Sequence, residues 1–131
     1  MGERTHVVAS FIGKDGTLTS DRNSTLTLGA KEGAFKAYDL VLGGLSHCLF
    51  ATLESIIDKM QISYDGVDLD ITGIKNDEKV ALLETVEVKV TAKGAEDEAK
   101  FEKAFEIATR YCSTYQTLSK VATMSWSVSF T

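Results

Sequence analysis

Residues 37–60 of the chain read AYDLVLGGLSHCLFATLESIIDKM, and this stretch decides the fold. Its length and composition predict one long helix. The helix is apolar on all sides over residues 40–53, which is the pattern of a helix buried in the middle of a structure. That uncharged part is too short to span a bilayer. Gly43 and Gly44 interrupt it, and because glycine in a helix interior costs about 1 kcal/mol relative to alanine, we expect another backbone to pack closely there.

The composition is that of an ordinary soluble globular protein. The chain has 131 residues, 44% apolar and 25% charged, which is enough for a single domain, 1–131, with its own core. The net charge of −5 argues against nucleic acid and against a membrane surface as partners. No segment resembles a signal peptide, so we expect a cytoplasmic protein.

Short β-prone segments precede the long helix and longer ones follow it. Residues 5–12, 17–21 and 25–29 predict an N-terminal meander of three strands. After the helix, apolar and polar side chains alternate over residues 67–72 and 86–92, which predicts half-buried antiparallel strands. The fold class is therefore α+β.

The last third of the chain predicts two helices and a final strand. Residues 95–111 form an amphipathic pattern with acidic side chains at its start and Arg110 at its end, which complements the helix dipole. The run STYQ at 113–116 fits a capping box that opens a short third helix. Residues 124–130 alternate apolar side chains with serines and predict a final strand.

The two cysteines, Cys48 and Cys112, are the candidates for chemistry. In a chain without a secretion leader, such a pair is more often catalytic or inert than a structural disulfide. Cys48 lies in mid-helix, so it is either a small core residue or a redox thiol that needs a nearby cation. Cys112 lies just before the third helix, where the helix dipole favours a thiolate, so local physics makes it the more acidic thiol. Cys112 also continues the apolar stripe of its helix, which leaves a packing role open.

Other chemistries lack their motifs. His47 and Cys48 are neighbours, so on a helix their side chains point about 100° apart and cannot easily share one ion. The sequence has no CxxC or HxxxH spacing, no phosphate-binding glycine loop and no paired catalytic carboxylates. We therefore predict no metal and no cofactor, and interpret His47 as a core residue or as part of the Cys48 pocket.

The two cysteine segments, in this order, resemble the superfamily of osmotically inducible protein C (OsmC) and organic hydroperoxide resistance protein (Ohr). They read DLVLGGLSHC at 39–48 and YCSTYQTL at 111–118, where the family has ELLxALxGC-like and YCPVxxxL-like runs. The resemblance covers nearly the whole chain. It implies an OsmC-like fold: an N-terminal β-meander, a buried central helix with Cys48, and a second antiparallel sheet with helices. It also implies an intertwined homodimer.

The resemblance further implies thiol-dependent reduction of organic hydroperoxides in an oxidative stress response. Cys48 would attack the peroxide and become a sulfenic acid, and Cys112 would condense with it to a disulfide. A dithiol reductant would restore both thiols. An arginine near the N-terminal strands would activate Cys48, with Arg22 preferred over Arg4. The family's proline after the second cysteine is Ser113 in this chain.

The resemblance gives Asp39 the role of orienting that arginine. Asp39 precedes Cys48 by about 13.5 Å along a helix axis and lies on the opposite face. It can therefore serve that thiol only across a subunit interface, or only if the helix starts after it. Organic hydroperoxides would be favoured over hydrogen peroxide by an apolar wall. The residues expected to form this wall are Leu45, Leu49, Phe50 and Tyr115.

Two other functions stay open on the sequence. An OsmC-like protein without peroxidase activity could bind a small apolar molecule at the dimer interface. A structural α+β dimer could carry two inert thiols. A cationic partner for Cys48 is the feature that would separate the peroxidase from the binding protein, because a buried thiol needs help to ionise.

Overall fold

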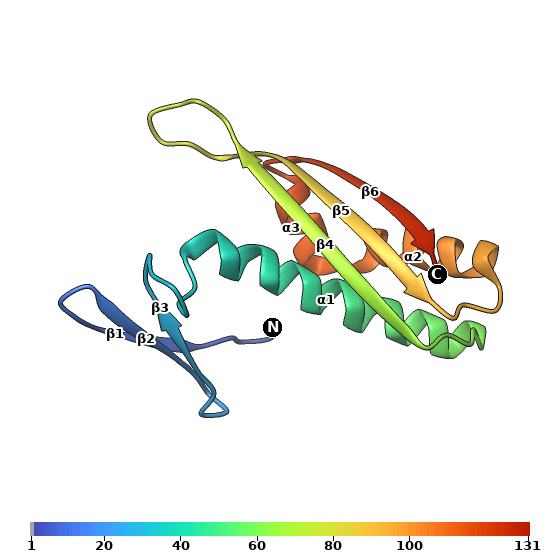
Figure 1. Ribbon diagram of the computed structural model, residues 1–131, viewed down its shortest axis with the longest axis horizontal. Helices are drawn as coiled ribbons and strands as arrows, with labels where there is room; N and C mark the ends of the chain where they lie inside the picture. The colour runs from blue at the N-terminus through green and yellow to red at the C-terminus, as the bar shows by residue number, and fades with distance from the viewer. Residues whose placement is uncertain (1) are drawn as a thin grey trace. The chain divides into compact units, whose positions relative to one another are not determined.

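The computed structural model describes residues 2–131 and consists of two compact units, Met1–Val41 and Leu42–Thr131. The first unit contains three strands: β1 (Val7–Ile12), β2 (Asp15–Ser20) and β3 (Thr25–Leu28). They pair antiparallel in the order β1-β2-β3, which confirms the predicted meander (Figure 1). The β1–β2 turn needs glycine, because Gly13 has a φ of 62°.

The strands of the first unit leave much apolar surface uncovered. Both faces of β1 are exposed along its whole length. The exposed large apolar side chains of this unit are Val7, Val8, Phe11, Ile12, Leu26 and Phe35. These side chains are therefore left exposed within the described part of the first unit, residues 2–41.

The central helix, α1 (Ala37–Met60), has the predicted bounds. Its buried residues follow one another at a spacing of four and so form a single stripe: Leu45, Leu49, Leu53 and Ile57. The helix is therefore buried along one side, and not on all sides as its composition suggested. A side-chain carbon added at Gly43 or Gly44 would meet no other atom within 4 Å, so the expected close backbone is absent from the described part of this chain.

By length and composition alone, α1 could also cross a membrane. Core helices of soluble proteins share that property, and its leucine stripe already has a place in the core of the second unit.

The sheet of the second unit is formed by β4 (Gly66–Lys75), β5 (Leu83–Lys93) and β6 (Thr123–Phe130), in that order. β4 and β5 pair antiparallel, as expected, but β5 and β6 pair parallel. The predicted antiparallel sheet was therefore wrong in its last strand, and the sheet is mixed. Between β5 and β6 the chain runs through two helices, which return it to the end of the sheet where β5 begins.

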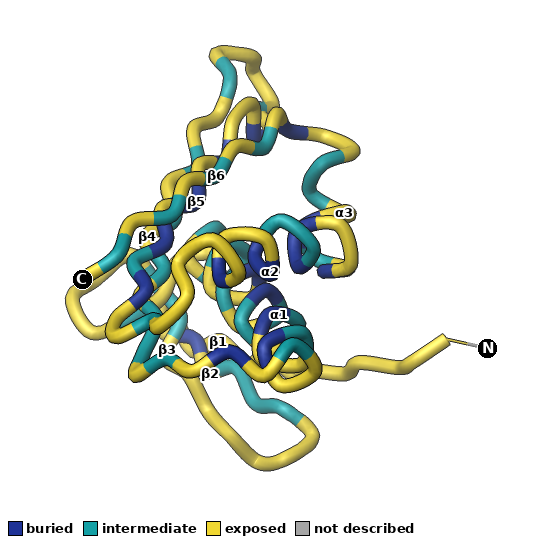
Figure 2. The backbone as a smooth tube through the Cα atoms, turned by 90° about the vertical axis from the view of Figure 1, so that its right-hand side faces the viewer, coloured by how far each residue is buried: buried dark blue, intermediate teal, exposed yellow. Residues whose placement is uncertain are grey.

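Those helices are α2 (Glu98–Tyr111) and α3 (Ser113–Ser119), and they cover one face of the sheet (Figures 1 and 2). Alternate residues of β5 face them and are buried: Val86, Val88, Val90 and Ala92. From α2, Phe101 contacts Phe130 and Phe105 contacts Trp126, with ring centroids 6.0 and 5.2 Å apart. This core fixes α2 on the sheet, and with it the residue that follows α2, Cys112.

The start of α2 differs from the prediction by three residues. The helix begins at Glu98 and not at Ala95, because the side chain of Asp97 accepts a hydrogen bond from the Lys100 N–H at 3.0 Å and caps it. The acidic residues before Glu98 therefore belong to the loop and the cap.

Candidate functional site

The two cysteines lie side by side although 64 residues separate them in sequence. The Sγ atoms of Cys48 and Cys112 are 3.2 Å apart, and both thiols are free. Cys48 comes from α1 and is half-buried, whereas Cys112 is fully buried at the junction of α2 and α3. The predicted proximity of the two thiols is confirmed, and only a short movement would join them in a disulfide.

Cys112 is held by both helices that meet at it. Its N–H donates to the Ala108 carbonyl at 2.8 Å and ends α2, while its sulfur accepts a hydrogen bond from the Tyr115 N–H at 3.4 Å and begins α3. The cap of α3 is thus the sulfur of Cys112 and not the hydroxyl of Ser113, so the predicted capping box was wrong by one residue. This leaves the Ser113 hydroxyl available for another partner.

That partner is Cys48. The Ser113 Oγ lies 3.8 Å from the Cys48 Sγ, within reach of a hydrogen bond to sulfur. Burial raises the pKa of Cys48, but hydrogen bonds outweigh it. They come from the hydroxyl and the N–H of Thr114, then from the Cys112 thiol and the Ser113 hydroxyl, and they lower the pKa of Cys48 from 9.0 to about 7. The Cys48 thiol therefore ionises more readily near neutral pH than an ordinary cysteine.

Cys112 has the opposite tendency. Its burial, followed by the neighbouring sulfur of Cys48, raises its pKa from 9.0 to about 11 despite hydrogen bonds from the N–H groups of Tyr115 and Thr114. The local prediction that Cys112 is the more acidic thiol was therefore wrong. The start of α3 does favour a thiolate, but the thiolate that it favours is Cys48.

Ser113 and Thr114 were missed as site residues by the sequence reasoning. The available signal was the replacement of the family's proline by Ser113, a residue with a hydroxyl that can donate. Thr114 gave no signal, because its contact with Cys48 depends on how α3 packs beside α1.

The residues predicted to form the apolar wall divide into two groups. Leu45 and Leu49 have no exposed surface and belong to the core stripe of α1. Phe50 is half-buried, and Tyr115, which follows the two hydroxyl residues, keeps 8% of its surface exposed. Burial raises the pKa of Tyr115, so its hydroxyl stays neutral.

The polar residues of the prediction lie in the first unit, whereas Cys48 lies in the second. Arg22 is exposed in the turn between β2 and β3, and Arg4 forms a 4.0 Å ion pair with Asp21. Asp39 accepts a hydrogen bond from the Lys36 N–H at 2.9 Å. Because α1 begins at Ala37, Asp39 is already helical, and of its two predicted routes to a thiol only the one across a subunit interface remains. The roles of Arg22 and Asp39 stay predictions.

His47 is exposed and is not a core histidine. It lies in a shallow depression of about 570 Å³ between α1 and β4, whose lining residues are Ser46, His47, Phe50, Val67, Asp68 and Leu69. Among the described residues, no group of three or more His, Cys, Asp or Glu side chains could hold a metal ion.

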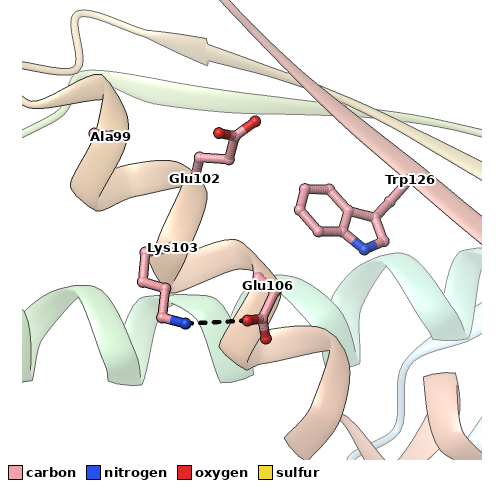
Figure 3. Close-up of a pocket in the computed structure, with 5 residues that line it drawn as sticks. All are labelled: Ala99, Glu102, Lys103, Glu106 and Trp126. Atoms are coloured by element: carbon pink, nitrogen blue, oxygen red, sulfur yellow. Dashed lines mark hydrogen bonds and ion pairs between the residues drawn. The ribbon is translucent and has the colours of Figure 1, made fainter.

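A second depression, of about 330 Å³, lies between α2 and β6 (Figure 3). The indole of Trp126 faces Glu102 and Glu106 across it. Hydrogen bonds from Lys103 at 3.2 Å and from Arg110 at 2.7 Å hold the pKa of Glu106 below its ordinary value. Lys103, Arg110 and Glu106 pair with one another at the surface. Among the described residues, the cysteine pair is therefore the better candidate for a reactive site.

The sequence profile of the OsmC-like protein family matches residues 29–127. The chain belongs to this family. The match includes both cysteines, so the resemblance drawn from their two segments is confirmed. A search of curated protein sequences found no match to the chain.

Solved structures of OsmC-like proteins share the fold over the full length. An OsmC-like protein from Mycoplasma pneumoniae is 18% identical with a TM-score of 0.88, and 99% of each chain is covered. An organic hydroperoxide resistance protein OsmC from Legionella pneumophila is 16% identical with a TM-score of 0.77, and 97% of each chain is covered. The organic hydroperoxide resistance protein OhrB of Bacillus subtilis is 15% identical with a TM-score of 0.70, covering 96% of this chain and 98% of that one. The family thus includes hydroperoxide resistance proteins, and the fold is shared with them.

Proposed function

We propose that the chain is a thiol-dependent peroxidase that reduces organic hydroperoxides in an oxidative stress response. The observation that carries the proposal is the 3.2 Å separation of the Cys48 and Cys112 sulfurs, with the pKa of Cys48 lowered and that of Cys112 raised. One thiol is ready to attack at neutral pH, and the other stays protonated beside it. This division of labour is what a nucleophile and a resolving thiol require.

The reaction begins at the Cys48 thiolate. Its sulfur attacks the terminal oxygen of the hydroperoxide, the O–O bond breaks, and the alkoxide takes a proton and leaves as an alcohol. Cys48 is oxidised to a sulfenic acid. The Cys112 sulfur then attacks the Cys48 sulfur, and the hydroxyl group leaves with the Cys112 proton as water. A dithiol reductant reduces the resulting disulfide and is itself oxidised. The cytoplasm suits such a cycle, because thiols are kept reduced there.

The test is hydroperoxide consumption with a dithiol reductant. We expect turnover of cumene or tert-butyl hydroperoxide by the wild type, no reaction with Cys48→Ser, and slower turnover with Cys112→Ser, because the dithiol must then reduce the sulfenic acid directly. Ser55→Ala, at an exposed position on the same helix, is the matched control and should behave as wild type. Wild-type turnover by Cys48→Ser would refute the proposal.

Arg22 and Asp39 are proposed to assist Cys48, Arg22 as the cation and Asp39 as the carboxylate that orients it. A guanidinium beside a thiolate lowers the pKa of the thiol further. Arg22→Ala should slow the reaction with hydroperoxide, whereas Arg22→Lys should keep part of the rate because it keeps the charge. Arg4→Ala is the matched control, and an equal loss in both alanine variants would remove the preference for Arg22.

We also propose that the chain forms a homodimer through its uncovered surfaces. The open face of α1 at Gly43 and Gly44 and the exposed apolar strands of the first unit support this proposal. Light scattering should give twice the chain mass of 14.2 kDa at micromolar concentration. The variant Gly44→Ala distinguishes a monomer from a dimer in which a partner helix packs against Gly44. In a monomer it should stabilise the helix by roughly 0.5–1 kcal/mol, whereas against a close partner helix it should weaken the dimer.

A ligand-binding function without turnover is the second candidate. The depression beside His47 and Phe50 has the volume of a small-molecule site. If no variant consumes any hydroperoxide, the binding of apolar molecules should be measured with the wild type. Phe50→Ala should then weaken binding, whereas Cys48→Ser should leave it unchanged.

A further inference from the structure

The first turn of α3 serves two sulfurs at once. Its cap is the sulfur of Cys112, which is fixed by the Tyr115 N–H at 3.4 Å. Its next residue, Ser113, places a hydroxyl 3.8 Å from the sulfur of Cys48. The proline of the family's motif could make no such contact, since it has neither hydroxyl nor N–H. The contact therefore depends on the serine at position 113 of this chain.

The contact depends on the oxidation state of the pair. A hydrogen bond to a charged acceptor is roughly twice as strong as one to a neutral acceptor. Cys48 carries a charge only as a thiolate. In a disulfide its sulfur is neutral and a weak acceptor. The hydrogen bond from the Ser113 hydroxyl therefore stabilises the reduced pair, and this stabilisation is lost on oxidation.

We propose that Ser113 raises the reduction potential of the Cys48–Cys112 pair by binding the Cys48 sulfur in its reduced form. The inference rests on the part of the proposed function in which these two residues form a disulfide, and it is independent of which oxidant forms it. In the reaction, a dithiol gives two electrons and two protons to the disulfide. Both protein thiols are released, and the Cys48 proton is partly lost to solvent at neutral pH. A stabilised dithiol form makes a disulfide easier to reduce.

Two further observations agree with this role. Thr114, the next residue, also donates to Cys48, so the donors come from consecutive residues of one turn. The turn is rigid, because Gln116 N–H bonds the Cys112 carbonyl at 3.0 Å and the Gln116 side chain bonds the Thr109 carbonyl at 2.9 Å. Donors held in place lose little freedom when the thiolate forms, so their hydrogen bonds act on the redox equilibrium.

The experiment equilibrates the full-length chain with glutathione buffers of defined ratio at pH 7. The fraction of disulfide is read by mass after acid quenching and alkylation. Ser113→Ala should shift the equilibrium toward the disulfide by about threefold to tenfold, which is about 15 to 30 mV for a two-electron couple. The contact is long and Ser113 is exposed, so a larger shift is not expected.

Ser113→Thr keeps a hydroxyl and should restore most of the wild-type value. Ser119→Ala is the matched control, because it removes a hydroxyl from the other end of the same helix, where it bonds the Gln116 carbonyl. A second readout is the thiolate absorbance near 240 nm in the Cys112→Ser background. There, Ser113→Ala should raise the pH at which Cys48 ionises, a change that a merely structural role would not produce.

Three outcomes would overturn the inference: a Ser113→Ala equilibrium within twofold of wild type, an equal shift in Ser119→Ala, or failure of the pair to form a disulfide. The outcome for the peroxidase is separate. A chain whose disulfide equilibrium responds to Ser113 but which consumes no hydroperoxide would uphold this inference and refute the peroxidase. An active peroxidase whose reduction potential is unchanged in Ser113→Ala would uphold the peroxidase and refute this inference.

Discussion

Oxidation of Cys48 and Cys112 to a disulfide should stabilise the fold by about 4 kcal/mol. The magnitude follows from the loop that the bond would close, since the two residues are 64 apart in sequence. A cross-link removes conformations from the unfolded chain, and for a loop of this length the loss corresponds to about 4 kcal/mol. Little native strain opposes it, because the sulfurs already lie 3.2 Å apart. Loss of the hydrogen bonds to the Cys48 thiolate reduces the gain slightly.

Urea unfolding with and without reductant measures this difference. Trp126, the one tryptophan in the chain, packs against Phe105 in the core of the second unit and reports unfolding by fluorescence. With a urea dependence of about 2 kcal/mol per molar, the midpoint should rise by about 2 M on oxidation. The slope should fall, because a cross-linked unfolded chain exposes less surface. Protein concentration must be equal in both samples, since association would shift both midpoints.

The double variant Cys48→Ser/Cys112→Ser is the control, and its urea unfolding midpoint should be the same with and without oxidant. An oxidised wild type that unfolds at the same urea concentration as the reduced protein would refute the reasoning, provided that mass analysis shows the intramolecular bond. That result would mean that the native structure must distort to form it.

Three other predictions concern the thiols and the core. At pH 7, iodoacetamide should alkylate Cys48 at least about 100-fold faster than Cys112 by peptide mass analysis, because thiol pKa values of about 7 and about 11 leave far fewer Cys112 thiolates; comparable rates would contradict this. The free energy of unfolding of the reduced chain, relative to Cys48→Ser, should rise between pH 7 and 9 and be lost as the pH falls through 7, since the folded pKa of Cys48 lies below its ordinary 9.0. Above pH 9 the raised pKa of Cys112 should act in the opposite direction, which Cys112→Ser would abolish. Phe105→Ala should cost about 3–5 kcal/mol in urea unfolding, because the ring is fully buried, whereas Glu102→Ala on the surface of the same helix should change it by less than about 0.5 kcal/mol.

Most of the fold could be predicted from sequence patterns within single helices and strands. The bounds of α1 could be predicted from the apolar run and its polar ends, and the strands from alternation. The parallel pairing of β6 could not, because alternation shows which face of a strand is buried but not which way its neighbour runs. The capping residue of α3 was predicted one residue too late, because the sulfur of Cys112, and not the Ser113 hydroxyl, accepts the capping hydrogen bond.

The acidity of the thiols was decided by tertiary contacts. Viewed along the chain, Cys112 lies nearest to the start of α3, and a local argument gives it the lower pKa. In the folded unit, burial of Cys112 raises its pKa, and the donors of that turn reach Cys48 from another helix. Only the packing of α3 beside α1 could reveal which sulfur receives them. The family resemblance pointed to Cys48, which is the thiol whose pKa these contacts lower.

The shared turn of α3 also has a consequence for the order in which the chain is made. Cys48 leaves the ribosome roughly 3 to 13 seconds before Cys112 at ordinary rates of synthesis. During that interval the nascent helix has no Cys112 thiol beside Cys48, and an oxidised Cys48 could proceed to irreversible acids. It also has no Ser113 or Thr114 beside it, so its thiol should keep an ordinary pKa and react slowly. The residues that lower the pKa of Cys48 lie on the same segment as Cys112. Cys48 is therefore not activated during synthesis before the second thiol is present.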